Sequence, residues 1–115
     1  MRAVVYDAYA TDNSRLKVAE VPDPKVGPSE VCIEVRAAGV NPVDWKLMTG
    51  GLDAMMDASF PVIPGWDVAG VVKAVGPDTP EFSPGDEVMA YAPSSRTWPT
   101  AARSRSTSRR RSRWR

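Results

Sequence analysis

The chain of 115 residues contains no histidine, and Cys32 is its single cysteine. One cysteine excludes an intrachain disulfide. Zinc sites are built from thiolates, imidazoles and carboxylates, usually with at least one soft or nitrogen ligand. Neither a catalytic nor a four-cysteine structural zinc site can be assembled from this composition, so we expect a protein that works without zinc.

Long apolar runs and targeting signals are also missing. No stretch approaches the ~18 apolar residues of a membrane span, and no leader combines a basic start with an apolar core. We therefore expect a cytoplasmic protein with no membrane partner. The apolar fraction of 43% is ordinary for a globular protein, and the length suits one domain with a modest core.

No phosphate-binding motif is present. No G-x-G-x-x-G follows a strand, so the dinucleotide-binding fingerprint is absent. Gly65 and Gly70 have the spacing of a P-loop, but Val71 and Val72 stand where Lys and Ser or Thr would be needed. We expect no pyrophosphate site, and turn formation and tight packing explain these two glycines better.

The stretch from Phe60 to Gly76, FPVIPGWDVAGVVKAVG, organises the chain. Its prolines make the entry extended, and Gly65 allows a sharp turn that carries Trp66 and Asp67. The β-branched residues that follow predict a buried strand over 68–75. Glycine within that strand indicates a bulge or a close backbone neighbour.

Further alternating segments predict strands over 2–6, 16–21, 31–36 and 87–91, separated by Pro/Gly turns. Asn41 is expected to cap a short helix that contains Pro42, Asp44 and residues 45–48. Residues 52–56 form either another helical turn or a loop. Short strands with one or two short helices predict a mostly β fold, a small and mostly antiparallel barrel.

These segments resemble the medium-chain dehydrogenase/reductase family. The pattern P-x-I-P-G-x-D-x-A-G-x-V-x-x-V-G, together with MRAVVY, EVCIEVRAAGVNPVD and FSPGDEV, is similar to its N-terminal GroES-like domain over residues 1–92. The match is closest to the zinc-free quinone oxidoreductase and enoyl reductase branch. In zinc-dependent members, Asn41 would be a cysteine and Trp66 a histidine.

The resemblance implies a site as well as a fold, a partly open GroES-like β-barrel. The loop and helix around Asn41 would form one wall of the active-site cleft. It implies cofactor-binding roles for Asn41 and Asp44, and a substrate pocket lined by Trp45, Lys46, Trp66 and Asp67. Helix capping is an equally good explanation of Asn41 and Asp44, and buried packing is the commoner role of a tryptophan. No residue is a convincing general acid, and we name no catalytic residue.

Charge divides the chain in two. Residues 1–92 hold all fourteen acidic side chains against seven Lys and Arg, a formal charge of −7, whereas residues 93–115 add eight arginines and no acid. The second segment lacks an apolar period, so we expect it to be disordered, with no packed element. It is compatible with an arginine-rich arm that binds nucleic acid, although the barrel before it resembles metabolic enzymes.

A shifted reading frame explains this tail better. Residues 99–109 can be encoded so that a start at the third base reads DGGTFAEYVA, which resembles the family's next segment. We expect residues 93–115 to be an out-of-frame reading and the Rossmann cofactor domain to be absent.

The expected parent is a zinc-independent, NADP- or NAD-dependent oxidoreductase that transfers hydride to a quinone, an enone or a similar carbonyl compound. The resemblance allows a homodimer of that parent, and we expect this chain to be inactive alone and to hold no bound cofactor. The alternatives are a nucleic-acid-binding protein and a co-chaperonin-like structural barrel.

Overall fold

The computed structural model describes residues 1–55, 58–92, 102–103 and 107–109. In chain order, the elements are β1 (Arg2–Val5), a 3-10 turn (Asn13–Arg15), β2 (Lys17–Glu20), β3 (Glu30–Gly39), α1 (Pro42–Met48), β4 (Asp67–Val75), β5 (Glu87–Tyr91), β6 (Ala102–Arg103) and β7 (Thr107–Arg109). The described part is mostly β with a single α-helix, as the sequence predicted. None of its helices is long and apolar enough to cross a membrane.

The predicted strands are confirmed, and most differ only at their ends. β5 has the predicted bounds, whereas β3 continues to Gly39, three residues beyond the predicted end. Of the two explanations offered for Gly70, the close backbone neighbour is confirmed; the register of β3 against β4 also shifts between Val35 and Ala37, but the extra residue there belongs to β3. Gly70 lies opposite Val35, where an added Cβ would stand 2.2 Å from the Glu34 carbonyl oxygen. Glycine is therefore required at this crossing.

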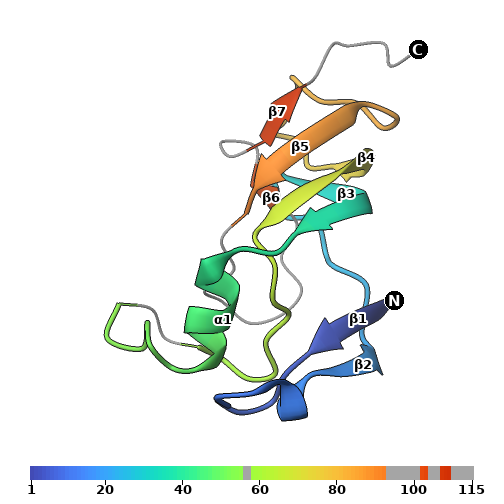
Figure 1. Ribbon diagram of the computed structural model, residues 1–115. Coiled ribbons are helices and arrows are strands. Elements are labelled where there is room, and N and C mark those ends of the chain that lie inside the picture. The colour runs from blue at the N-terminus through green and yellow to red at the C-terminus, as the bar shows by residue number, and fades with distance from the viewer. Residues whose placement is uncertain (56–57, 93–101, 104–106, 110–115) are drawn as a thin grey trace, which may run out of the picture.

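β1 and β2 form a separate two-stranded sheet, and the other strands form a five-stranded sheet in the order β6-β3-β4-β5-β7. β6 and β7 are the two edge strands, yet only four peptide steps separate Arg103 from Thr107. Four steps span at most about 14 Å, whereas the edges of a flat five-stranded sheet lie about 19 Å apart. The sheet is therefore curled toward a partly open barrel (Figure 1).

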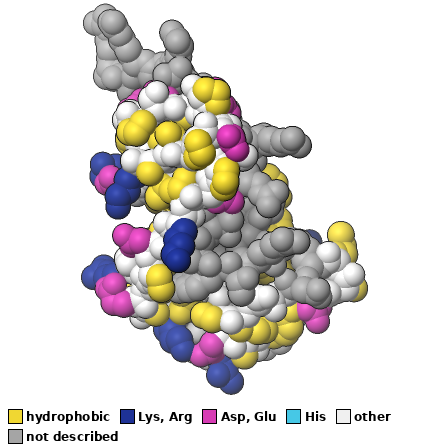
Figure 2. Space-filling view, turned by 180° about the vertical axis from the view of Figure 1, so that it is seen from behind, with side chains coloured by type: hydrophobic (Ala, Val, Ile, Leu, Met, Phe, Trp, Pro, Cys, Tyr) yellow, Lys and Arg dark blue, Asp and Glu magenta, His cyan; other side chains and the backbone are white. Residues whose placement is uncertain are grey.

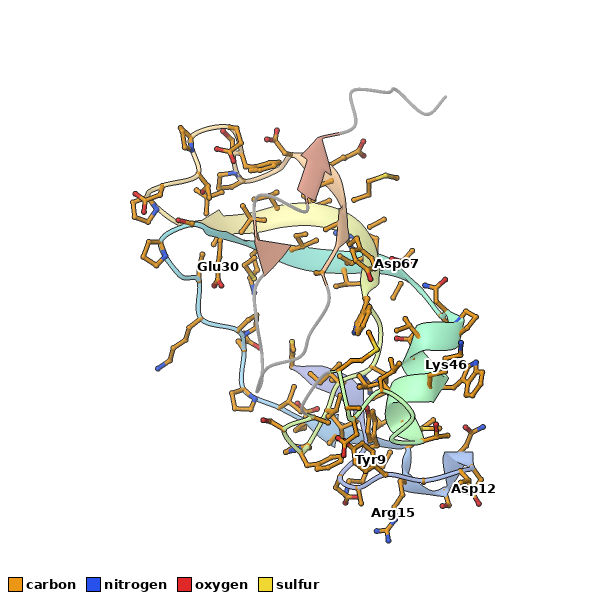
Figure 3. The ribbon with its side chains drawn as sticks, turned by 90° about the vertical axis from the view of Figure 1, so that its left-hand side faces the viewer. Tyr9, Asp12, Arg15, Glu30, Lys46 and Asp67 are labelled. Atoms are coloured by element: carbon orange, nitrogen blue, oxygen red, sulfur yellow. The ribbon has the colours of Figure 1, made fainter. Side chains whose placement is uncertain are left out.

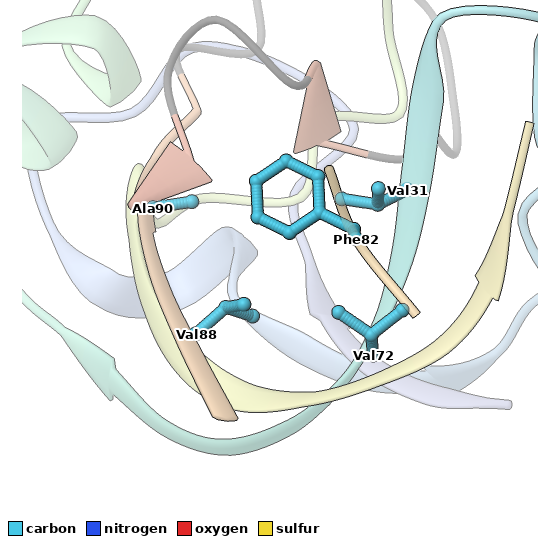
Figure 4. Packing of buried hydrophobic residues seen from close by; sticks show 5 residues of the cluster. All are labelled: Val31, Val72, Phe82, Val88 and Ala90. Atoms are coloured by element: carbon cyan, nitrogen blue, oxygen red, sulfur yellow. The ribbon is translucent and has the colours of Figure 1, made fainter. Parts of the chain in front are cut away.

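Two hydrophobic clusters hold the elements together. We call the first the sheet core, and Figure 4 shows how Phe82 packs over the sheet within it; its members are Val31, Val72, Phe82, Val88 and Ala90. We call the second the helix core, and its members are Tyr6, Leu47, Met48, Val62 and Trp66. The helix core joins α1 to the end of β1, where Tyr6 and Val62 exchange backbone hydrogen bonds of 3.0 and 2.9 Å.

The expectation of no packed element after residue 92 needs a correction at two places. β6 pairs with β3 in the register Glu30↔Arg103, and β7 pairs with β5 in the register Val88↔Arg109. Backbone pairing to an open sheet edge requires no apolar period, which is why composition gave no sign of it. Residues 93–101, 104–106 and 110–115 lie outside the described residues, as do residues 56–57 beyond the turns at 51–55.

Candidate functional site

The site begins where β3 passes into α1. Asn41 has extended backbone angles of −127° and 162° and is the N-cap of α1, with Pro42 at the first helical position. Asp44 is the third residue of the helix, and its Oδ2 accepts a hydrogen bond of 2.7 Å from the Asn41 N–H. This is the carboxylate half of a capping box, so the helix start at Asn41 and the capping role of Asp44 are confirmed, whereas the Asn41 side chain makes no cap hydrogen bond.

Asp44 also fastens the helix to the Pro-Gly turn. Its Oδ1 accepts a 2.9 Å hydrogen bond from the backbone N–H of Gly65, which has a φ of +103°. The Asp44 side chain is buried, and both of its carboxylate oxygens are used by backbone donors. A carboxylate that satisfies two backbone donors away from water fixes their relative position. The helix start and the turn at Gly65 therefore form one rigid unit.

The Asn41 side chain makes a long-range contact. Its Nδ2 donates a 2.6 Å hydrogen bond to Oδ2 of Asp67, twenty-six residues later in the chain. Both residues are half-buried. Figure 3 shows Asp67 at the end of the five-stranded sheet that adjoins α1, with Lys46 on α1 itself. Because a carboxylate accepts only from the nitrogen, the bond fixes which way the amide of Asn41 faces.

The two tryptophans have different environments. Trp66 is 6% exposed within the helix core, and its ring meets the Tyr91 ring edge-on at 5.9 Å between centroids. Trp45 is 54% exposed, and Nζ of Lys46 lies 5.8 Å from the centroid of its ring. The structure thus brings Asn41, Asp44 and Asp67 into one hydrogen-bonded group. Trp45, Lys46 and Trp66 lie outside these bonds, and their substrate-pocket roles stay predictions.

A pocket of about 570 Å³ opens on the five-stranded sheet beside this group. It is lined by residues 37–39 of β3, 67–69 of β4 and 89–91 of β5. Asp67 is the predicted site residue that lies in this lining. Sequence reasoning missed the other lining residues, although the small residues Ala37, Ala38 and Gly39 end a strand and leave space above a sheet. This run of small residues was the sequence signal from which the pocket could have been predicted.

One buried hydroxyl lies near the site. Tyr6 is fully buried in the helix core, and its hydroxyl has no hydrogen-bond partner within the described ranges. Burial raises the pKa of Tyr6 to about 12, and Tyr9 and the Asp44 carboxylate add to the shift. The group is therefore a neutral phenol at physiological pH.

On the described residues, acidic and sulfur-containing side chains do not gather into a metal-binding group. Across residues 1–55 and 58–92 and the two short edge strands, no three His, Cys, Asp or Glu side chains are placed to hold an ion. Cys32 is half-buried, and desolvation by burial raises the pKa of its thiol.

Comparison with known proteins agrees with the barrel. Residues 27–111 match the profile of the alcohol dehydrogenase GroES-like domain. The chain is 46% identical over 90 residues to the chloroplastic quinone-oxidoreductase QR1 of Triphysaria versicolor, a match that covers 78% of this chain and 27% of the relative. The chain thus spans about a quarter of the length of this curated relative.

Solved structures give the same fold. The quinone oxidoreductase of Coxiella burnetii matches with a TM-score of 0.77 and 25% identity, covering 95% of this chain and 36% of the other. The cobalt- and zinc-bound thermostable alcohol dehydrogenase of Pyrobaculum aerophilum matches with a TM-score of 0.69 and 39% identity, covering 80% and 26%. Proteins with bound metal and quinone oxidoreductases are thus both similar to this chain.

Proposed function

The chain belongs to the alcohol dehydrogenase GroES-like domain family, and from this premise we propose that it is the substrate-side domain of a zinc-independent, NAD(P)H-dependent oxidoreductase. The reaction would be hydride transfer to a quinone, an enone or a similar carbonyl compound. Similarity to QR1 and to the Coxiella burnetii enzyme supports a small-molecule substrate. It gives no support to the nucleic-acid-binding and co-chaperonin alternatives.

The observation that carries the proposal is the hydrogen-bonded group of Asn41, Asp44 and Asp67. Asp44 holds the start of α1 against Gly65, and Asp67 fixes the amide of Asn41. A wall whose polar groups are oriented before a ligand arrives needs little reorganisation during the reaction. Its contribution is to position a substrate and a cofactor, which is the main source of rate when no general acid is available.

The residues fit only part of a nicotinamide cofactor. A reduced nicotinamide supplies the hydride when it is bound. In this chain the Asn41 amide is suited to contact such a ring, but no glycine-rich loop and helix N-terminus is present for the pyrophosphate. The cofactor would thus be held mainly by residues of the longer protein, and we expect the 115-residue chain to show no micromolar binding of NADPH.

Zinc independence is part of the proposal. It is supported by the composition, because no histidine and one cysteine are available, and Asn41 and Trp66 occupy the positions where zinc-dependent relatives would carry ligands. We expect chelator treatment to leave activity unchanged. A cytoplasmic location and a homodimer of the longer protein complete the proposal.

The reading frame after residue 92 also remains a proposal. We infer that residues 1–92 are the native domain and that residues 93–115 come from a shifted frame, although β6, β7 and the family match all extend into this segment. The intact mass of the gene product in its own cell tests this inference. A mass near 12.5 kDa would show that residues 93–115 are part of the natural product and would contradict the inference. A two-domain mass of roughly 35 kDa would support the shifted frame.

A fusion protein tests the activity. Residues 1–92 would replace the corresponding segment of QR1, and NADPH oxidation would be measured with a quinone acceptor. We expect activity, and a reduction of kcat by about tenfold in Asn41→Ala, equivalent to the loss of one polar contact. Lys25→Ala, at an exposed position that neither lines the pocket nor bonds to Asn41, Asp44 or Asp67, serves as the control. A folded fusion that oxidises no NADPH with any quinone or enone would contradict the proposed function.

A further inference from the structure

The pocket is a hollow made by strand register. Two rows of directly paired residues cross the sheet, Ala37–Ala69–Met89 and Gly39–Asp67–Tyr91. Residues paired across neighbouring strands share a face of the sheet. Where a row begins with small residues, nothing larger than a methyl group stands above the backbone. The result is a flat floor at Ala37, Gly39 and Ala69, bounded on the β5 side by Met89 and Tyr91.

Gly39 leaves room at the polar end of this hollow. A Cβ added there would lie 3.1 Å from Cβ of Asp67, 3.2 Å from its Oδ2 and 3.6 Å from Nδ2 of Asn41. A side chain at position 39 would therefore press into the Asn41–Asp67 hydrogen bond. Glycine leaves the pair closed and the floor open. The same residue thus leaves space for both the pair and the hollow.

Asp67 is the charged residue of the lining. Its Oδ2 accepts from Asn41, whereas its Oδ1 has no hydrogen-bond partner on the described part of the chain. Arg36 precedes the floor residue Ala37, but its guanidinium pairs with Glu34 at 3.0 Å. The hollow thus offers one oriented carboxylate oxygen above an apolar floor.

We propose that this pocket binds a planar organic cation, with its ring on the floor and a cationic N–H directed at Oδ1 of Asp67. A charged donor makes the stronger hydrogen bond to a carboxylate. Small residues admit a flat ring, and an aromatic ring and a thioether beside it supply further contacts. The proposal goes beyond the proposed function, because it concerns ligand binding by this chain and requires no hydride transfer.

Figure 2 shows hydrophobic side chains at the surface of the half of the molecule that holds the five-stranded sheet. A second copy of the chain is a competing occupant of such a surface. A symmetric contact centred on the pocket would bring two Asp67 carboxylates together without a cation between them. Like charges brought together in an interface are unfavourable, so the small cation is the better occupant.

The test is a titration of the full 115-residue chain followed by its backbone amide resonances. Benzamidine is the cationic probe, and benzamide is its neutral counterpart of the same shape. We expect benzamidine to bind about five- to tenfold more tightly, the difference between a charged and a neutral hydrogen bond. The shifts should centre on Gly39, Asp67 and Ala69, and added salt should reduce the preference.

Variants locate the charge. Asp67→Asn should remove the preference for benzamidine, whereas Glu87→Gln, the same change at an exposed position of β5 outside the pocket, should keep it. Ala69→Leu should weaken both probes by filling the floor. If Asp67→Asn does not fold, the proposal is still tested by the ratio of the affinities of the unaltered chain for benzamidine and benzamide, and by the effect of Ala69→Leu on both affinities.

Equal affinity for the two probes, or loss of the preference in Glu87→Gln as well, would overturn the proposal. So would a dimer, detected by sedimentation, that buries the floor and binds no benzamidine. Hydride transfer is measured separately in the QR1 fusion, so failure of this proposal is distinguishable from failure of the proposed function.

Discussion

The sheet core and the helix core stabilise the molecule by different means. The sheet core is entirely apolar and is built from neighbouring strands and the turn that carries Phe82. The helix core joins segments that are distant in the sequence and encloses the hydroxyl of Tyr6, with the buried carboxylate of Asp44 close by. Beside the first cluster, the buried hydroxyl of Thr79 donates a 2.7 Å hydrogen bond to the Gly76 carbonyl, whereas the second region holds a buried carboxylate and a buried hydroxyl that has no partner on the described residues. The candidate site lies on the second region and at its junction with the sheet.

Alanine substitution of one glycine in each region should give the largest difference in stability between them. Gly70→Ala would place a Cβ 2.2 Å from the Glu34 carbonyl oxygen, where backbone meets backbone. We expect a loss of about 4 kcal/mol in the free energy of unfolding, or no folded protein. Gly51→Ala follows α1, where the added Cβ would stand 3.3 Å from the Lys46 carbonyl oxygen. We expect Gly51→Ala to lower the free energy of unfolding by less than about 1 kcal/mol. Urea denaturation measures both variants, and equal losses would contradict the expected difference between the two regions.

Asp44→Ala tests the polar character of the helix region. The substitution removes the acceptor for the N–H groups of Asn41 and Gly65. We expect a loss of about 2–3 kcal/mol, because hydrogen bonds to a charged group are lost and buried donors are left unpaired. Asp44→Asn keeps an acceptor oxygen and should lose less. Amide hydrogen exchange at the two donors should accelerate, and unchanged protection would contradict the role assigned to Asp44.

Alkaline pH should weaken the helix region through Tyr6. Its pKa is about 12 in the folded protein, above the ordinary value of 10.0. The unfolded chain therefore releases the phenolic proton first, so stability present below pH 10 is lost as the pH rises toward 12. The loss should reach about 2 kcal/mol. Tyr6→Phe should lack this part of the pH dependence, and identical pH profiles for the two proteins would refute it.

At neutral pH, Tyr6→Phe should have a smaller effect of opposite sign. It removes a buried hydroxyl that has no partner on the described residues while keeping the ring in place. We expect a gain of about 1 kcal/mol in the free energy of unfolding. Tyr91→Phe, at an exposed position, should change it by less than about 0.5 kcal/mol. A marked loss in Tyr6→Phe would show that the hydroxyl is satisfied after all.

The smallest expected effect concerns the reactivity of Cys32, which lies in strand β3 of the five-stranded sheet. Burial raises the pKa of its thiol, the charge of Lys73 opposes this, and Asp23 adds to it. Less thiolate is therefore present at pH 8 than for a free cysteine. Alkylation by iodoacetamide should be several-fold slower in the folded chain than in the same chain in urea. Equal rates would indicate an ordinary, accessible thiol.

Much of the fold could be predicted because its signals are local. Alternation over 87–91 gave β5 its bounds, and Asn41, Pro42 and Asp44 marked the start of α1. Gly70 indicated a close backbone neighbour. The strands β6 and β7 could not be predicted, since pairing at a sheet edge depends on backbone groups rather than on side-chain pattern.

The site was predictable only in part. The residues of the loop after β3 could be named, but their partners lie far away in sequence. The Asn41–Asp67 hydrogen bond spans twenty-six residues, and the pocket floor depends on which residues β3, β4 and β5 bring opposite one another. If the pairing register of one of these strands shifted by one residue, side chains from its other face would take the place of those that form the floor. Such pairing is a property of the assembled sheet.

Trp66 and Asp67 are consecutive, yet the first packs into the helix core and the second faces the pocket. The Trp66 carbonyl also accepts a 2.7 Å hydrogen bond from the Ala92 N–H at the end of β5. Surface turns of this domain can therefore vary in length, whereas the spacing between Trp66 and Asp67 cannot change without disturbing either the helix core or the pocket. Deleting the one residue between Gly65 and Asp67 would remove the indole from the helix core, and inserting a residue between Trp66 and Asp67 would separate the indole from the strand that carries the carboxylate. In related proteins, natural length variation should avoid this dipeptide even where its side chains change.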